Sequence, residues 1–266
     1  MVMRRIELGV VALLLVAQPA AGARLDLTWG RCAPAGGEAH RYFTCSGNEG
    51  ANVLVASFAT DRDHPDFDSL AAYIDIAGTP MPLPDWWQLA NEGSCRAHAL
   101  SLATTFGDLP GMQCADPWAG AARGGITYFA TQAYPPPLPW PVPAVNRADL
   151  RISFTRATPM PLTAGTEYYA FTLTISDEKS TGQDSCGGCS AGVCLFLKEL
   201  VVSGPSGSEV LDDWVVDGSR TATWQCADGV IENDPFSPPV DFCEAIAGCA
   251  LAVHNRTWGQ LKSLYR

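Results

Sequence analysis

Between Glu167 and Ile175 the chain reads EYYAFTLTI, and between Val193 and Val202 it reads VCLFLKELVV. Both stretches are short and rich in β-branched and aromatic residues, and the segments around them contain glycine, serine and aspartate. Residues of this kind fit the pleated, half-buried surface of a sheet, and the flanking residues favour turns. The two stretches therefore predict β-strands.

Similar segments recur along most of the chain. Leu25–Trp29 alternates apolar and polar residues, and helical signals are few, because Ser94–Thr105 is ambiguous and only Trp258–Tyr265 has the spacing of a short amphipathic helix. The pattern predicts an all-β protein, an antiparallel β-sandwich of the jelly-roll or immunoglobulin/cohesin-like kind. The other predicted strands are Asn52–Phe58, Leu70–Ile76, Gly125–Gln132, Leu150–Phe154, Val210–Val216 and Thr221–Gln225.

The N-terminus has the features of an export signal. Arg4 and Arg5 precede the apolar run Leu8–Ala17, and the small residues Ala21-Gly22-Ala23 follow it. This order predicts a secretory signal peptide over residues 1–23. The apolar run is too short to span a membrane, which takes about 20 apolar residues. We therefore expect a secreted or cell-surface protein with no membrane span.

The remaining chain is expected to form a single domain over residues 24–254. Its main interruption is the proline-rich segment Tyr134–Pro143, YPPPLPWPVP, which cannot lie in a central strand. Too few strands precede this segment to make a sandwich of their own, so we expect a long loop within one sandwich. Residues 255–266 are expected to form a C-terminal tail or short helix, which either docks on the sandwich or serves in sorting or partner binding.

Charge excludes one large class of partners. The 266 residues include 17 Lys and Arg against 28 Asp and Glu, a formal net charge of −11. Such an acidic surface argues against nucleic acid as a ligand. The hydrophobic fraction of 47% is enough for a core, so an acidic disordered coil is also excluded.

Ten cysteines in an exported chain predict disulfide bonds, because the compartment is oxidising. Short loops favour Cys32–Cys45 and Cys95–Cys114, whereas the pairing of the other six stays open. The CxxC motif at Cys186 and Cys189 has two alternative interpretations, a zinc site and a redox-active pair. A zinc site needs a second matched pair of ligands, and a redox-active pair needs a following helix, and the sequence indicates neither. The ten are Cys32, Cys45, Cys95, Cys114, Cys186, Cys189, Cys194, Cys226, Cys243 and Cys249.

Two further motifs have a catalytic or metal-binding interpretation. Gly188–Gly192 matches GxSxG, but a strand follows it where a nucleophile elbow needs a helix, so it is interpreted as a turn. Four carboxylates fall within eight residues, at Asp61, Asp63, Asp66 and Asp68. They are either calcium ligands or a solvated acidic loop between two strands. No other cofactor is expected.

Tryptophans near predicted loops are candidates for ligand binding. Trp86 and Trp87 follow Asp85, and Trp118 follows Asp116-Pro117. An exposed indole beside polar residues can stack on the apolar face of a sugar. The alternative is that these side chains fill the core.

Several of these segments together resemble uncharacterised exported bacterial β-sandwich proteins. The resemblance rests on Leu25–Trp29, Pro84-Asp-Trp-Trp-Gln88, Thr163–Phe171, the Cys186–Cys189 turn and Thr257–Arg266, and it covers most of the chain after the signal. The strand around Tyr168 is also similar to strands of cohesin-type and immunoglobulin-like sandwiches. The resemblance implies a fold but no activity.

These observations favour a non-catalytic secreted or cell-surface protein with a structural or binding role. Its expected partner is an extracellular glycan or a surface protein. One alternative is a carbohydrate-binding module that uses exposed tryptophan. The other is an extracellular polysaccharide hydrolase that acts through two carboxylates. Fold alone does not separate these functions.

Overall fold

The computed structural model describes residues 22–78, 82–105, 111–131, 147–212 and 220–225. These residues form strands and two short 3₁₀ helices, η1 (Ala33–Ala35) and η2 (Asp85–Trp87). The strands are β1 (Arg24–Trp29), β2 (His40–Arg41), β3 (Ala51–Ala59), β4 (His64–Gly78), β5 (Leu100–Ala103), β6 (Ala122–Thr131), β7 (Arg147–Leu162), β8 (Tyr168–Ser176), β9 (Val193–Gly204), β10 (Gly207–Leu211) and β11 (Thr221–Trp224).

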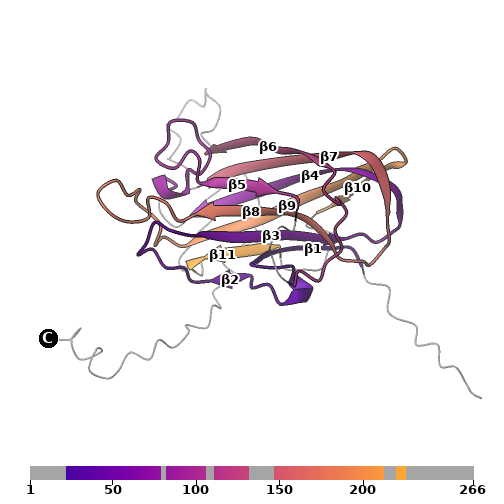
Figure 1. Ribbon diagram of the computed structural model, residues 1–266, viewed down its shortest axis with the longest axis horizontal. Coiled ribbons are helices and arrows are strands. Elements are labelled where there is room, and N and C mark those ends of the chain that lie inside the picture. Colours follow the sequence, from indigo (N-terminus) through magenta and orange to yellow (C-terminus); the bar gives the residue numbers. More distant parts are fainter. Residues whose placement is uncertain (1–21, 79–81, 106–110, 132–146, 213–219, 226–266) are drawn as a thin grey trace, which may run out of the picture.

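The strands form two sheets that face each other (Figure 1). The small sheet has the order β1-β3-β8-β5. The large sheet has the order β2-β11-β9-β4-β7-β6, and β10 pairs with the same central strand β9. Every pairing is antiparallel except that of β11 with β2. The chain is thus an all-β sandwich held by disulfides, which confirms the predicted fold class.

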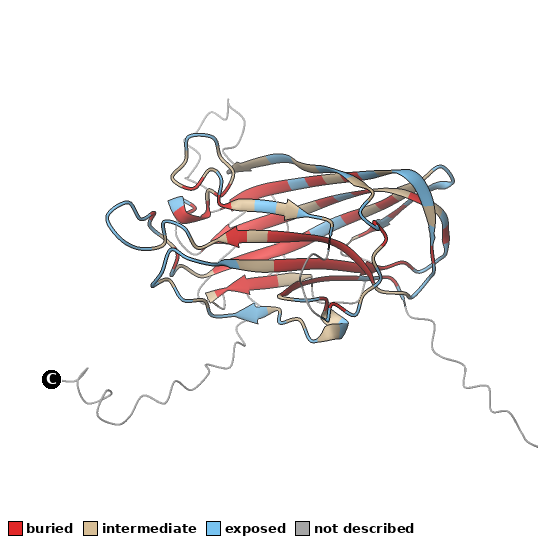
Figure 2. Cartoon of the chain, viewed as in Figure 1, coloured by how far each residue is buried: buried red, intermediate tan, exposed pale blue. Residues whose placement is uncertain are grey.

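The alternation of side chains along β4 and β7 explains where the core lies. On β4, Leu70, Ile74 and Ile76 are buried against the small sheet, whereas Ala71 and Tyr73 lie on the other face and are more exposed. Successive side chains on a strand point to opposite faces, so one face of the large sheet lines the core and the other is its outer face. Figure 2 shows this change between buried and exposed positions along the strands.

Each segment predicted to be a strand overlaps an observed one, but the boundaries differ. The acidic segment is the main correction, because Asp66 and Asp68 lie inside β4 and not in a loop. The first residues of β4 pair with the end of β7 across two register shifts, and Phe67 between the two aspartates is fully buried. The irregular register breaks the period-two pattern, so the sequence does not reveal the start of this strand.

Several predictions fall outside the described residues. These are most of the signal peptide, the proline-rich segment Tyr134–Pro143, and the tail at 255–266 with its expected helix. Within the ranges that the structure describes, no helix is long and apolar enough to cross a membrane.

The seven described cysteines are disulfide-bonded as predicted, whereas Cys226, Cys243 and Cys249 lie outside the described residues. The two predicted pairings are wrong. The bonds join Cys32 to Cys114, Cys45 to Cys189 and Cys95 to Cys186, at sequence separations of 82, 144 and 91 residues. Sheet pairing brings distant loops together, which outweighs the small entropic advantage of closing a short loop. Cys186 and Cys189 bond to different partners, so the CxxC motif is neither a redox pair nor a zinc-binding pair. Cys194 is also disulfide-bonded.

Candidate functional site

The three candidate tryptophans lie in the core. Trp86 and Trp87, in η2, and Trp118, in the loop before β6, are each 0% exposed. Trp118 packs against Phe67 and Phe154, with ring centroids 5.2 and 5.7 Å away. No indole face is therefore open for stacking on a sugar, and the core alternative describes all three residues.

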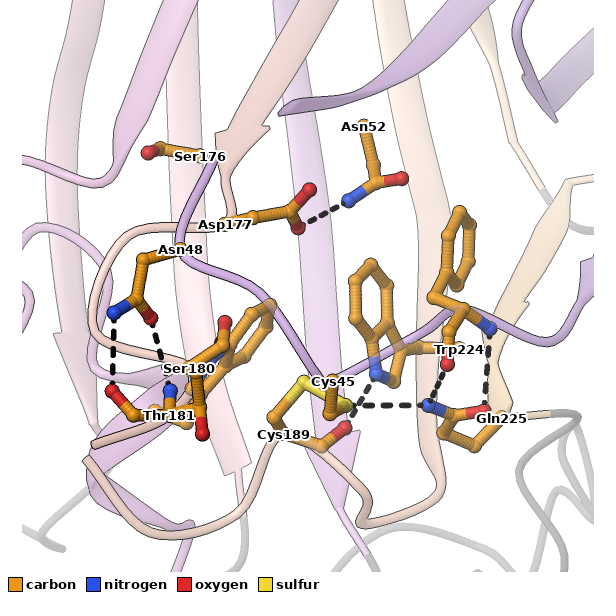
Figure 3. Close-up of a disulfide and its surroundings, with 12 residues drawn as sticks. Cys45, Asn48, Asn52, Ser176, Asp177, Ser180, Thr181, Cys189, Trp224 and Gln225 are labelled. Carbon is orange, nitrogen blue, oxygen red and sulfur yellow. Dashed lines mark hydrogen bonds between the residues drawn. A yellow bond between two sulfur atoms is a disulfide. The ribbon is translucent and has the colours of Figure 1, made fainter. Parts of the chain in front are cut away.

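Trp224 is the centre of an aromatic cluster at one end of the sandwich. Its ring stacks on Phe43 at 3.9 Å between centroids, and the rings of Trp86 and Trp87 lie 4.9 and 5.5 Å away. Its Nε1 donates a hydrogen bond to the carbonyl of Cys189 at 2.6 Å, beside the Cys45–Cys189 disulfide (Figure 3). The indole is thus fixed by packing, by a hydrogen bond and by a neighbouring covalent link.

Polar side chains close the same end, as Figure 3 shows. Asn48 donates to the carbonyl of Thr181 at 3.0 Å and accepts from the Thr181 amide at 2.9 Å. Asn52 donates to Asp177 at 2.7 Å. These bonds join segments that are far apart in sequence. The hydrogen bonds at this end of the molecule therefore stabilise the packing of distant segments against each other.

The four aspartates of the acidic segment do not converge. Asp63 accepts a hydrogen bond from the amide of Ala164, Asp66 accepts from the amide and hydroxyl of Ser206, and Asp68 accepts from Ser69. In the described part of the chain, no three His, Cys, Asp or Glu side chains lie close enough together to hold a metal ion. The segment fastens neighbouring loops instead.

A buried hydrogen-bonded pair that the sequence did not predict lies near these aspartates. Nε2 of His64 lies 2.6 Å from Oε2 of Glu209, and Nε of Arg62 lies 3.2 Å from the same oxygen. The pair joins the start of β4 to β10 and is almost fully buried. It fixes the β9–β10 hairpin against the neighbouring strand.

The outer face of the large sheet carries a different arrangement. Side chains from four adjacent strands form a row across it, in which cations alternate with tyrosine rings. Arg151 pairs in register with Tyr73 on one side and Tyr128 on the other, and its Cζ lies 5.3 and 5.4 Å from their ring centroids. Lys198 extends the row, with Nζ 5.3 Å from the ring of Tyr73. These are cation–π distances. We call Lys198, Tyr73, Arg151 and Tyr128 the cation–tyrosine row.

A shallow depression of about 470 Å³ lies against Tyr73 and Arg151, the two central residues of this row. Four polar residues line it: Thr127, Ser153, Glu199 and Arg151. The hydroxyl of Thr127 donates to the carbonyl of Arg151 at 3.2 Å. The ring of Tyr128, at 47% exposure, is among the most exposed large apolar side chains described. A concave surface with an aromatic wall and a few polar groups is typical of a small-ligand site. The lining residues are Ala71, Ala72, Tyr73, Thr127, Arg151, Ile152, Ser153 and Glu199.

Next to the row, two carboxylates lie directly opposite each other. Asp75 of β4 pairs in register with Asp149 of β7, and each is only 6% exposed. Oδ2 of Asp75 lies 2.9 Å from Nη2 of Arg147 and 3.7 Å from Nζ of Lys198. Burial raises the pKa of Asp75 to about 6, the charge of Asp149 adds to this rise, and Arg147 and Lys198 oppose it. The net charge of this cluster therefore changes as pH passes through about 6, because Asp75 gains or loses its proton there.

A second perturbed carboxyl lies just before β8. Burial raises the pKa of Glu167 to about 7, and the negative charge of Asp26 contributes to the rise. Arg24 forms an ion pair with Asp26 at 2.6 Å and partly offsets this effect. Glu167 is thus a carboxyl that holds its proton well above the pKa of an exposed glutamate.

Sequence reasoning missed the cation–tyrosine row, although part of its signal is visible. Tyr73 in LAAYIDI and Arg151 in LRISF stand at outward positions of alternating strands. What the sequence lacks is the register that places the two residues opposite each other, together with the bulge beside Tyr128.

The sequence matches no protein-family model and no curated protein. Among solved structures it is similar to a GH20 exo β-N-acetylglucosaminidase from Vibrio harveyi, determined in complex with N-acetylglucosamine, at 11% identity and a TM-score of 0.25. The alignment covers 75% of this chain but 18% of that enzyme. A likeness this low supports no statement about the activity of this chain.

Proposed function

We propose that the protein is a non-catalytic exported binding protein that holds a glycan on the outer face of its large sheet. The observation that carries the proposal is the cation–tyrosine row beside a polar depression. The disulfides fit an oxidising, extracellular setting, in which glycans are abundant surface components.

The chemistry of the face suits a sugar. A pyranose ring has an apolar C–H face, which can stack on the exposed ring of Tyr128, and hydroxyl groups at its edge. Thr127, Ser153 and Glu199 offer hydrogen-bonding partners for those hydroxyls. The row crosses four strands, or about 14 Å at the usual strand spacing, so it can contact more than one sugar unit.

A polysaccharide hydrolase is the competing use of carboxylates on this face. Such an enzyme needs two carboxyl groups about 5–10 Å apart on either side of an accessible glycosidic bond. Asp75 and Asp149 are buried, and Asp75 is engaged by Arg147 and Lys198. Glu199 is the one carboxylate among the residues that line the depression. This arrangement favours binding over cleavage.

A glycan array with a hydrolysis readout tests the proposal. We expect the protein to be retained on a subset of glycans without cleaving them. Tyr128→Ala should weaken retention about 3- to 10-fold, because it removes an aromatic contact. Tyr42→Ala is the matched control, because Tyr42 is similarly exposed, at 44%, but lies outside the cation–tyrosine row.

Three results would contradict the proposal. The first is that no glycan is retained, and the second is that glycan is cleaved. The third is that Tyr42→Ala weakens retention as much as Tyr128→Ala does.

A further inference from the structure

Arg151 differs from the other cations near the row. Arg147 and Lys198 both contact Asp75. The guanidinium of Arg151, in contrast, lies between two tyrosine rings, and within the described ranges it takes part in no ion pair or side-chain hydrogen bond. The side chain is exposed and lines the depression. Its donors are therefore available to a ligand.

We propose that the ligand is an acidic glycan whose sugar carboxylate binds to the guanidinium of Arg151. This inference rests on the proposed glycan-binding function and narrows its substrate class. A guanidinium is a planar fork that matches a carboxylate with two parallel hydrogen bonds. The rings of Tyr73 and Tyr128 lie on either side of the guanidinium and restrict its freedom before the ligand arrives, which lowers the entropy lost on binding.

The remaining groups of the depression select a sugar acid over a simple anion. Glu199 repels a bare anion but can accept a hydrogen bond from a sugar hydroxyl. Thr127 and Ser153 can bind further hydroxyls. The net charge of −11 also opposes unspecific attraction of polyanions, so recognition has to come from the local geometry around Arg151.

Lys198 supplies a second positive charge on the same row. It lies on β9, two strands away from Arg151 on β7, with β4 between them. Two strand spacings amount to about 10 Å. A chain of acidic sugars carries carboxylates at regular intervals, so one chain lying along the row can contact both cations.

Calorimetric titration with a galacturonate hexamer and its methyl ester tests the ligand class. The ester has the same sugar backbone but no negative charge. We expect the acid to bind about 10-fold or more tightly than the ester, because a hydrogen bond to a charged group is lost in the ester. Arg151→Ala should remove most of this preference, because only Lys198 then remains on the row to contact a sugar carboxylate. Arg151→Lys should restore it only in part, because lysine keeps the charge without the fork.

Arg41→Ala is the matched control. Arg41 is also exposed and lies over an aromatic ring, 5.4 Å from the centroid of Phe43, but it is on the edge strand β2. We expect it to bind acid and ester as the wild-type protein does. Circular dichroism of each variant checks that the fold is intact.

The outcomes separate this inference from the proposed function. Equal binding of acid and ester, with weaker binding of both by Tyr128→Ala, overturns the acidic ligand but supports glycan binding. Tighter binding of dextran sulfate than of galacturonate, glucuronate or mannuronate hexamers overturns the assignment of a carboxylate. Failure of every glycan, charged or neutral, overturns the proposed function itself.

Discussion

The tryptophan cluster and the cation–tyrosine row use aromatic side chains in opposite ways. Trp224 is fully buried and bonded to the carbonyl of Cys189, and a disulfide holds the neighbouring loops. Tyr128 is half exposed, and its ring contacts a cation that no carboxylate pairs with in the described structure. An aromatic residue beside a loop is thus a poor guide to a binding site. Its position in the fold decides whether its side chain is buried in the core or exposed to solvent.

Hydrogen bonding sharpens this contrast. Trp29 donates through Nε1 to the carbonyl of Thr223 at 3.1 Å, and Trp86 donates to Ser180 at 3.0 Å. The N–H groups of these indoles donate to acceptors inside the protein, so these side chains contribute to stability and not to recognition. A buried tryptophan also brings a large apolar area into the core.

The largest effect should come from Trp224→Ala. This change removes the ring that contacts Phe43, Trp86 and Trp87, and it leaves the carbonyl of Cys189 without its donor. We expect a loss of about 4 kcal/mol in the free energy of unfolding. Tyr128→Ala, on the exposed face, should cost roughly 1 kcal/mol or less. Denaturant unfolding followed by fluorescence measures both.

Trp224→Phe is the control for ring volume, because it keeps most of the packing and loses only the hydrogen bond and part of the ring. Its free energy of unfolding should lie between those of the wild-type protein and Trp224→Ala. Comparable losses for Trp224→Ala and Tyr128→Ala would abolish the distinction between a buried structural cluster and an exposed row.

The sequence predicts the two regions unequally, for physical reasons. Strands such as Val193–Val202 follow from local composition and alternation, which depend on near neighbours. The burial of Trp86 and Trp118 depends on which loops fold over the open ends of the sandwich. The pairing of Cys45 with Cys189 likewise depends on contacts across 144 residues. Such long-range contacts are set by the sheet topology, and no local pattern encodes them.

The second-largest effect per residue is the dependence of stability on pH, which arises from the buried carboxyls Glu167 and Asp75. The pKa of Glu167 is about 7 in the folded protein against 4.5 for an ordinary glutamate, and that of Asp75 is about 6 against 3.8. Between these values the folded state holds protons that the unfolded chain releases. The stability that these two carboxyls contribute is therefore fully present below about pH 4 and is lost as pH rises to 8, by about 3 kcal/mol per group.

Thermal unfolding between pH 5 and pH 8 measures this trend. Glu167→Gln should flatten the part of the curve that lies below pH 7, because glutamine is neutral throughout. Glu49→Gln, at an exposed loop position, should leave the slope unchanged. A wild-type melting temperature that is constant or rises from pH 5 to pH 8 would show that neither carboxyl holds its proton in the folded state.

The smallest effect concerns ligand binding at the boundary between the buried carboxylates and the row. Asp75 faces Lys198 on β9, Arg147 and Asp149 on β7, and Tyr73 on its own strand. When pH falls through about 6, Asp75 takes up a proton and its attraction for Lys198 is lost, so Lys198 can turn to a ligand carboxylate. We expect an acidic hexamer to bind about threefold more tightly at pH 5 than at pH 7.5, which corresponds to the energy of one exposed ion pair.

Lys198→Met should abolish this pH dependence of binding. Lys179→Met removes the same charge from the exposed loop after β8 and should preserve the dependence. Binding that is independent of pH in the wild-type protein, or that weakens at pH 5, would show that protonation of Asp75 does not control ligand binding through Lys198.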